Sequence, residues 1–327
     1  MSWNKLCNKQ DLQLLGTLSG GQSFRWKYNE NVKEWRGVFF KTAWKLRENE
    51  KSIEYNVIGS LLETGRKRNN KGDITNETYF KKVLDNYFRL DCNLNEYYEE
   101  WSEKDELFKS ACKQFYGIRM LNQEPVENLF SFICSQNNHI SRISSMVEKL
   151  CENYGDKICD YEDTTYYAFP DVEKLAPEEV DKALRNLGFG YRAKFIQKSA
   201  AQILEWGGEK WFESLKEMKY KDAKQELIKL CGIGPKVADC ICLMSLNHLE
   251  SLPVDTHVYQ IAAQNYLPHL RGKKSVTDKM YTEIGDHFRQ LFGDKAGWAH
   301  TILFCADLKK FQTNTETEEK SKRKKKK

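Results

Sequence analysis

The stretch Leu230-Cys231-Gly232-Ile233-Gly234-Pro235-Lys236 decides the fold of this chain, together with Pro253-Val254-Asp255-Thr256-His257 shortly after it. Two glycines that flank one apolar residue predict a tight turn between two helices. Such a turn presents backbone N–H groups at the start of the second helix, where a phosphate anion binds well. This stretch therefore predicts a helical scaffold with a phosphate-binding hairpin.

Two residues beside this turn have the properties of reactive groups. Lys236 falls in the first turn of the second helix, where the positive end of the helix dipole lowers the cost of losing the ammonium proton. A neutral lysine is a nucleophile. Taken singly, Lys236 is as easily a surface lysine, and Asp255 is as easily a helix N-cap. An amine nucleophile beside a phosphate anchor nevertheless predicts chemistry on a nucleic acid.

The composition indicates a folded protein with unevenly placed charge. The chain has 327 residues, of which 40% are hydrophobic and 13% aromatic, and this balance favours a globule over disorder. Seven Lys or Arg lie in the last eight residues, and the remainder has 45 basic and 47 acidic residues. Between Arg185 and Lys236 there are 11 basic and 6 acidic residues. This basic stretch suits a nucleic-acid surface, and it equally suits an ordinary solvated helix face.

The ten cysteines include no Cys-x-x-Cys pair, and the six histidines form no close cluster. We therefore expect reduced thiols in an intracellular protein, with no cofactor and no metal site. The N-terminus lacks a secretory h-region, and no apolar run approaches the ~20 residues that span a bilayer, so no membrane association is expected. The tail Lys322–Lys327 predicts nuclear import or non-specific binding to polyanions. A mitochondrial form stays open.

Hydrophobic periodicity predicts an α+β fold. Residues 16–60 alternate in polarity, as in Ser23–Tyr28, which predicts an antiparallel sheet of about four to six strands. From Thr78 the apolar residues recur at helical spacing, and after Glu124-Pro125 nearly every segment does so. We predict an N-terminal α+β domain at 1–114, an all-helical domain at 115–312 and a disordered basic tail at 313–327.

Five further segments occur in the order found in one enzyme family. With the hairpin and Asp255, they resemble the eukaryotic 8-oxoguanine DNA glycosylase/AP lyase family of the helix-hairpin-helix superfamily, from about Ser19 to Asp307. This resemblance implies a TBP-like antiparallel sheet followed by an all-α helix-hairpin-helix domain. It also implies a monomer that acts on damaged double-stranded DNA without a cofactor. The segments are Ser19–Trp26 (SGGQSFRW), Phe130–Asn138 (FSFICSQNN), Leu187–Ala193 (LGFGYRA), Lys236–Met244 (KVADCICLM) and Ala296–Ala299 (AGWA).

The resemblance implies that Lys236 and Asp255 are the catalytic pair. Lys236 would attack C1′ of the damaged nucleotide, expel the base and form a Schiff base, which allows strand scission by β-elimination. Asp255 would stabilise the cationic sugar in the transition state and help to manage the lysine proton.

The resemblance also implies a pocket for a base flipped out of the duplex, with Asp255 at its edge. Cys240 and Phe304 would cover the two faces of the purine. The carbonyl of Gly21 would accept a hydrogen bond from N7–H, which oxidised guanine has and guanine lacks. His300 stands where the family carries a glutamine that binds the Watson–Crick edge. A neutral imidazole offers one donor and one acceptor in a different geometry.

The resemblance further implies a set of DNA contacts. Asn137 would fill the space left by the flipped base, and Tyr191 would wedge into the duplex. Two arginines would bond the opposite cytosine, and the hairpin amides and one histidine would bind phosphates. His139 replaces an asparagine of the family pattern, which could alter selectivity for the opposite base. The set is Asn137, Arg142, Tyr191, Arg192, Gly232, Gly234 and His257.

The sequence thus favours a bifunctional DNA glycosylase/AP lyase for base excision repair. Its expected substrates are 8-oxoguanine and the ring-opened formamidopyrimidine form of guanine, opposite cytosine. Two alternatives stay open. The first is an enzyme of the same superfamily that excises another damaged base because of His300. The second is a non-catalytic damage-binding protein that uses only the hairpin, although the presence of both Lys236 and Asp255 argues against it.

Overall fold

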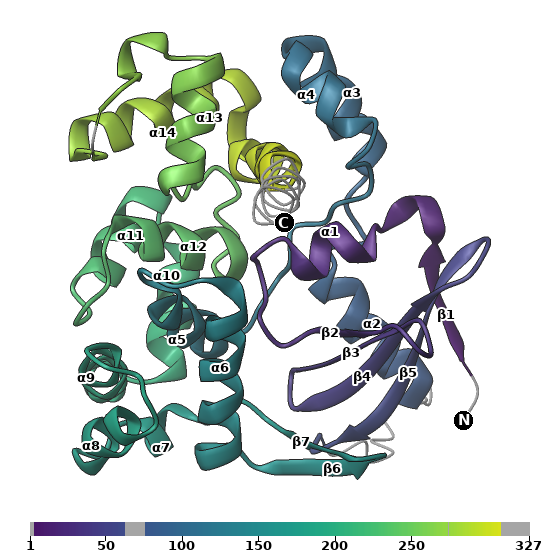
Figure 1. Cartoon of the computed structure of the whole chain (residues 1–327), viewed down its shortest axis with the longest axis vertical. Coiled ribbons are helices and arrows are strands. Elements are labelled where there is room, and N and C mark those ends of the chain that lie inside the picture. The colour runs from purple at the N-terminus through teal and green to yellow at the C-terminus, as the bar shows by residue number, and fades with distance from the viewer. Residues whose placement is uncertain (1–2, 63–75, 274, 309–327) are drawn as a thin grey trace, which may run out of the picture.

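A computed structural model describes residues 3–62, 76–273 and 275–308 of the chain. It places an antiparallel sheet beside a larger body of helices (Figure 1). The two expected families of elements, strands first and then helices, are therefore confirmed. The predicted basic tail at 313–327, with its import signal, lies outside the described residues.

The N-terminal sheet has five antiparallel strands in the order β1-β5-β4-β3-β2, within the expected number. Helix α2 lies against this sheet, and Phe80 of α2 meets the Trp44 ring edge-on at 5.6 Å. Trp44 in turn stacks on Phe39 at 5.1 Å, so aromatic rings fill the core under the helix. The elements are β1 (Asn4–Asn8), α1 (Leu14–Ser19), β2 (Lys27–Asn29), β3 (Glu34–Phe39), β4 (Thr42–Glu48), β5 (Ser52–Ser60) and α2 (Asn76–Tyr87).

The strand predicted at Ser23–Tyr28 is mostly wrong, because only its last two residues belong to β2. Its alternating pattern has another cause. Phe24 is buried in the core of the helical part, whereas Trp26 is buried in the core of the sheet. The segment therefore crosses between the two cores, with Phe24 in one and Trp26 in the other.

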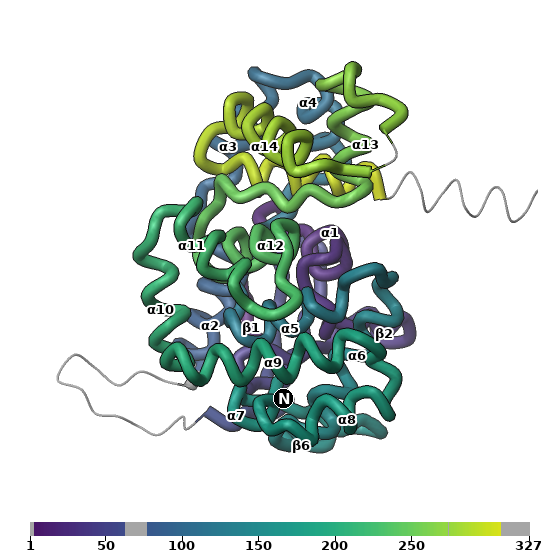
Figure 2. The backbone as a smooth tube through the Cα atoms, turned by 90° about the vertical axis from the view of Figure 1, so that its left-hand side faces the viewer, coloured from purple at the N-terminus to yellow at the C-terminus, as the bar shows by residue number. Residues whose placement is uncertain are grey.

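Helices make up most of the chain after residue 93, and Pro125 starts α5 as its first residue. Figure 2 shows α9 (Arg192–Glu205) and α12 (Pro235–Ser245) in front of the strands of the sheet. The helices are α3 (Leu94–Lys104), α4 (Glu106–Cys112), α5 (Pro125–Ser135), α6 (Ile140–Tyr154), α7 (Val172–Leu175), α8 (Glu179–Asn186), α9 (Arg192–Glu205), α10 (Glu209–Glu217), α11 (Tyr220–Ile228), α12 (Pro235–Ser245), α13 (Thr256–Asn265), α14 (Asp278–Phe292) and residues 296–308.

One hairpin departs from the all-helical expectation for residues 115–312. Strands β6 (Lys157–Tyr161) and β7 (Thr164–Tyr167) pair antiparallel. Tyr166 of β7 is buried with Val38 and Ala43 of the N-terminal sheet. The hairpin thus forms where the sheet offers a surface to pack on.

Helices α3 and α4 share the core of the later helices. The Tyr97 ring meets the Trp298 ring at 5.8 Å, and the Trp101 ring meets the Phe292 ring at 6.4 Å. Residues of both helices therefore pack with the C-terminal end of the described chain. The boundary at residue 114 stays a prediction.

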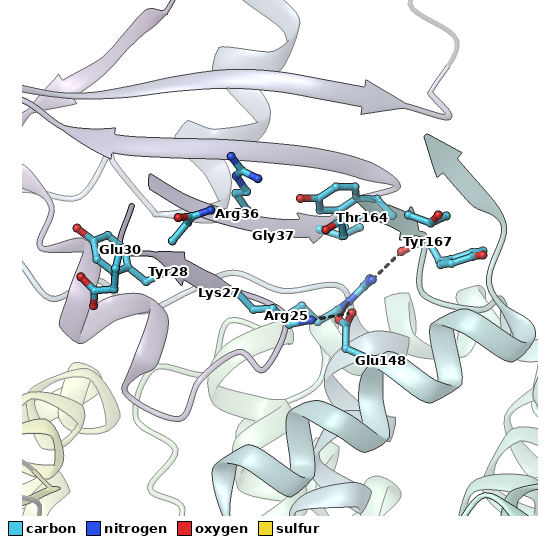
Figure 3. Close-up of a pocket in the computed structure, with 13 residues that line it drawn as sticks. Arg25, Lys27, Tyr28, Glu30, Arg36, Gly37, Glu148, Thr164 and Tyr167 are labelled. Carbon is cyan, nitrogen blue, oxygen red and sulfur yellow. Dashed lines mark hydrogen bonds and ion pairs between the residues drawn. The ribbon is translucent and has the colours of Figure 1, made fainter. Parts of the chain in front are cut away.

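Arg25 holds the crossing segment in place. Its buried guanidinium donates to the Tyr167 carbonyl at 2.6 Å and lies 3.6 Å from a Glu148 oxygen (Figure 3). A Glu127 oxygen lies 3.8 Å away on another side. A buried guanidinium is costly unless anions surround it. Paired in this way, Arg25 ties the crossing segment to α5, α6 and the β6–β7 hairpin.

Candidate active site and DNA-binding surface

The predicted turn lies between α11 and α12, and its two glycines have different constraints. Gly232 has φ +81°, and a Cβ there would come within 2.3 Å of the Phe195 ring. Gly234 is the N-cap of α12 with φ −99° and has no close neighbour for a Cβ. Lys236 is the second residue of α12, as predicted. The sequence Gly-Ile-Gly therefore combines one glycine required by geometry with one at a helix start.

We expect Gly232→Ala to destabilise the chain by about 1–3 kcal/mol, because a methyl group there forces both backbone strain and a clash with Phe195. Gly234→Ala is the matched control, since it adds the same methyl group to the same turn without a clash. It should cost less than about 1 kcal/mol. Urea unfolding of both variants measures the difference, and equal losses would contradict this account of the turn.

One pocket contains all six residues predicted as catalytic or base-binding. They come from separate elements: a loop after α1, helix α12, the start of α13 and the helix at 296–308. The fold therefore brings together side chains that are distant in sequence. The six are Gly21, Lys236, Cys240, Asp255, His300 and Phe304, and the other lining residues are Gly20, Gln22, Phe132, Leu243, Met244, Pro253, Val258 and Thr301.

Lys236 reaches the pocket beside an aromatic ring. Its Nζ lies 4.9 Å from the centroid of Phe132, a distance typical of a cation–π contact. Cys240 follows one turn later on the same helix face and is buried. Burial raises the pKa of the Cys240 thiol to about 11, although the Lys236 charge opposes the rise. Cys240 is thus a neutral, polarizable wall of the pocket at neutral pH.

Asp255 is the N-cap of α13, as the sequence predicted. Its Oδ1 accepts hydrogen bonds from the backbone N–H groups of His257 at 2.9 Å and Val258 at 3.0 Å. These bonds fix the carboxylate at the edge of the pocket. Capping uses only Oδ1, so the carboxylate can hold its place and still present its second oxygen to a ligand.

His300 is buried at 4% exposure, and burial lowers its pKa to about 4 although the Asp255 carboxylate opposes the shift. The imidazole is therefore neutral at physiological pH. Its ring lies 5.5 Å from the Phe288 ring and 6.3 Å from the Phe304 ring. Its Nε2 has no hydrogen-bond partner among the described residues. A buried polar atom without a partner is costly, so a bound ligand that bonds this nitrogen gains affinity.

Gly21 lines the pocket beside Phe304. It has φ +82°, and a Cβ there would lie 3.8 Å from Phe304 Cε1. The next residue, Gln22, holds this segment in place. Its side-chain Nε2 donates to the backbone carbonyl of Arg119 at 2.9 Å, and its backbone carbonyl accepts from Gln123 Nε2 at 2.8 Å. The role of Gln22 was not visible in the motif Ser19–Trp26, because its partners lie about a hundred residues away.

Three of the predicted DNA contacts lie side by side on the surface. Asn137, with φ +47°, donates from Nδ2 to the Tyr191 hydroxyl at 3.4 Å. Tyr191 is 43% exposed. Arg142 is exposed as well, and its guanidinium is 3.5 Å from the Gly188 carbonyl. The loop between α5 and α6, the first turn of α6 and the N-cap of α9 thus present an amide, a cation and a phenol, respectively.

Arg192 lies behind this group and is buried. Its guanidinium donates to the carbonyls of Gln136 and Asn137, with one bond to Asn137 at 3.2 Å. In the free protein, Arg192 therefore supports the loop that carries Asn137. A direct contact with an opposite cytosine stays a prediction, and it would require some of these bonds to be exchanged.

Two further residues complete the surface. Gln136 donates from Nε2 to the Gly232 carbonyl at 2.7 Å, which joins the Asn137 loop to the hairpin. No pattern in the sequence pointed to this bond. His257 lies in the first turn of α13, with its ring 5.9 Å from Phe304 and its Nδ1 3.9 Å from an Asp307 oxygen. The Asn137 loop is therefore bonded to the hairpin, and His257 lies near Phe304 of the pocket.

Over residues 3–62, 76–273 and 275–308, no group of three or more His, Cys, Asp or Glu side chains could hold a metal ion. No helix within these same ranges combines the length and apolarity that a membrane crossing needs.

Two family models match successive parts of the chain. Residues 5–129 match the family model of the 8-oxoguanine DNA glycosylase N-terminal domain. Residues 130–284 match that of HhH-GPD superfamily base excision DNA repair proteins. The N-glycosylase/DNA lyase of Saccharomyces cerevisiae is 36% identical over 92% of this chain and 85% of its own length. That of Arabidopsis thaliana is 34% identical over 91% and 78%.

A solved structure gives the same result in three dimensions. It is the 8-oxoguanine glycosylase/lyase of Clostridium acetobutylicum in complex with double-stranded DNA that contains cytosine opposite 8-oxoguanine. Its TM-score is 0.76 at 30% identity, with 95% of this chain and 99% of that chain covered.

The hairpin, the lysine and the pocket define a helix-hairpin-helix base excision DNA repair protein, and the sequence match agrees. With the N-terminal match and the two curated relatives, the chain belongs to the 8-oxoguanine DNA glycosylase family. It is therefore an enzyme, and a solely damage-binding role is set aside.

Proposed function

We propose that this enzyme excises 8-oxoguanine opposite cytosine from duplex DNA and then nicks the strand. The observation that carries the proposal is the convergence of Lys236, Asp255, Gly21, Cys240 and Phe304 on one pocket. The Clostridium protein was solved with the same lesion and the same opposite base. The ring-opened formamidopyrimidine form of guanine is proposed as the second substrate, because it presents a similar edge to the pocket.

The proposed first step is displacement of the base. Lys236 Nζ gives up a proton and forms a bond to C1′ while the C1′–N9 bond breaks. The base leaves with the bonding electrons and takes up that proton. Positive charge develops on the sugar during this step. The Asp255 carboxylate at the pocket edge stabilises that charge. The capping bonds to His257 and Val258 hold it there without reorganisation.

The proposed second step is strand scission. The lysine adduct becomes an imine when the sugar ring opens, and the imine acidifies the C2′ proton. Removal of that proton expels the 3′ phosphate by β-elimination. Water then releases the lysine from the imine. As proposed, both steps use only groups of the protein, the DNA and water.

Recognition of the lesion is proposed to depend on the walls of the pocket. A flipped purine loses its stacking in the duplex, and Cys240 on one side with Phe304 on the other replaces it. The Gly21 carbonyl accepts from N7–H of the oxidised base. Guanine has an unprotonated N7, so it would set two acceptors against each other, and the mismatch disfavours it by a few kcal/mol, to order of magnitude.

Borohydride trapping tests the proposal. A labelled duplex with one 8-oxoguanine opposite cytosine is compared with duplexes that carry guanine or uracil at the same place. A covalent adduct on the 8-oxoguanine duplex alone is the expected result, because borohydride reduces the imine. Trapping on uracil in place of 8-oxoguanine, or on no duplex, would overturn the proposed substrate.

A second candidate substrate follows from His300, whose Nε2 has no partner among the described residues. If this nitrogen is only a weaker substitute for the family's glutamine, His300→Gln should increase excision of 8-oxoguanine about two- to twelve-fold, the value of one hydrogen bond. Single-turnover rates over a panel of damaged bases measure this. A variant that gains 8-oxoguanine excision but loses another, preferred lesion would instead show that His300 has redirected the pocket.

We also propose that the enzyme acts as a monomer in the nucleus. A repair glycosylase acts where the DNA is, and the basic segment Lys322–Lys327 suits nuclear import. Fluorescent fusions with and without this segment test the location, and sedimentation of the free protein tests the oligomeric state.

A further inference from the structure

Asp239 is a buried carboxylate that the proposed chemistry does not use. It lies on α12 between Lys236 and Cys240, it is 0% exposed, and it does not line the pocket. A fully buried charge must be paired and hydrogen-bonded to be tolerated. The partners of Asp239 therefore show which elements it holds together.

Four donors from outside α12 converge on the Asp239 carboxylate. Lys224 Nζ and the Tyr220 hydroxyl, both on α11, lie 2.7 Å from its two oxygens. Ser251 Oγ donates to it at 3.0 Å, and the Tyr281 hydroxyl of α14 donates to Oδ2. Burial raises the pKa of the Tyr281 hydroxyl, and the Asp239 carboxylate raises it further. That hydroxyl therefore stays protonated and donates.

Two of these partners, Ser251 and Tyr281, connect Asp239 to the segment just before Asp255. Ser251 also bonds the backbone carbonyl of Asp239 at 3.0 Å. The Tyr281 hydroxyl accepts a hydrogen bond from the Val254 N–H at 3.2 Å, and Val254 is the residue before Asp255. The segment from Ser251 to Val254 is thus attached at both ends to the helix that carries Lys236.

We propose that Asp239 is a positioning residue that sets the distance between Lys236 and Asp255. This inference rests on the proposed function, because it assigns the two groups to one reaction. Hydrogen bonds to a buried carboxylate are short and strong, so the Asp239 network resists sliding of α12 against the start of α13. Reacting groups lose rate steeply when they are displaced by about 1 Å.

Tyr281→Phe removes the hydroxyl that joins Asp239 to Val254 and keeps the ring. The matched control is Tyr266→Phe, because the Tyr266 hydroxyl also bonds a carboxylate, that of Asp105, at 3.0 Å. Asp105 caps α4 and lies outside the pocket. Each variant thus loses one tyrosine–aspartate bond within the helical part of the chain.

The measurements are the single-turnover rate of base excision at saturating enzyme, the Kd for the same duplex and the unfolding midpoint in urea. We expect Tyr281→Phe to lower the rate by about 10- to 100-fold with little change in Kd. Tyr266→Phe should lose a similar amount of stability and keep a rate close to that of the wild type. Asp239→Asn, if it folds, should show at least the rate loss of Tyr281→Phe.

A Tyr281→Phe variant with the wild-type rate would overturn the inference. Equal rate losses in the two tyrosine variants would also overturn it, because the effect would then follow stability and not position. Wild-type protein that forms no borohydride adduct with any damaged duplex would refute the proposed function itself, and with it the inference. Borohydride trapping with the wild-type protein therefore distinguishes failure of the inference from failure of the proposed function.

Discussion

Replacing Lys236 with glutamine is expected to abolish both base excision and the borohydride adduct. The rate should fall by a factor on the order of 10⁴ or more, because the attacking amine is lost and no other group in the pocket replaces it. Glutamine keeps most of the side-chain length and its contact with Phe132. DNA binding should therefore survive, and single-turnover excision on the 8-oxoguanine duplex with a gel for the adduct measures the effect.

Lys229→Gln is the matched control for that experiment. Lys229 lies just before the same hairpin, is 59% exposed and pairs with Glu226 at 2.6 Å. Its substitution removes the same charge from the same region without touching the pocket. A similar loss of rate in both variants would show that Lys236 contributes positive charge toward DNA and is not the nucleophile.

Replacing Asp255 with asparagine is expected to separate the two roles of this residue. Asparagine caps helices about as well as aspartate, so the bonds to His257 and Val258 persist and stability should change little. The negative charge beside the developing sugar cation is lost. We expect base excision to slow by about 10²- to 10⁴-fold, measured as a single-turnover rate.

Asp255→Ala completes this comparison because it removes the cap as well as the charge. It should lose about 1 kcal/mol of stability beyond that of Asp255→Asn, as judged by urea unfolding. An Asp255→Asn enzyme with a wild-type rate would mean that Asp255 serves the fold alone. The lysine would then have to be activated by its place in α12.

Much of the fold could be predicted from periodicity, and the exceptions have physical causes. The helices after Glu124-Pro125 follow from apolar residues at helical spacing. At Ser23–Tyr28, alternation arises because Phe24 and Trp26 enter different cores. The pattern is the same as that of a strand, although most of the segment pairs with no other strand. The β6–β7 hairpin was missed because its strands are only five and four residues long, and it is stabilised by packing on the sheet.

The site could be predicted as a set of residues but not as an arrangement. Position in a motif was enough to predict that Asp255 caps α13 and that Lys236 opens α12. The support given by Arg192 to the Asn137 loop depends on contacts between residues about 55 apart, which no local pattern encodes. The same is true of the Asp239 network. The sequence therefore indicated the proposed reactive groups, and the structure added the contacts that hold them in place.

The walls of the pocket also impose an order on the synthesis of the protein. Gly21 emerges from the ribosome long before His300 and Phe304, and all three line one cavity. A nascent chain with Lys236 already folded into α12 would still lack the wall that recognises a base. The pocket is thus incomplete until residue 304 has joined the fold, and a message cut short before residue 300 would yield a protein without two residues of the proposed base-binding site.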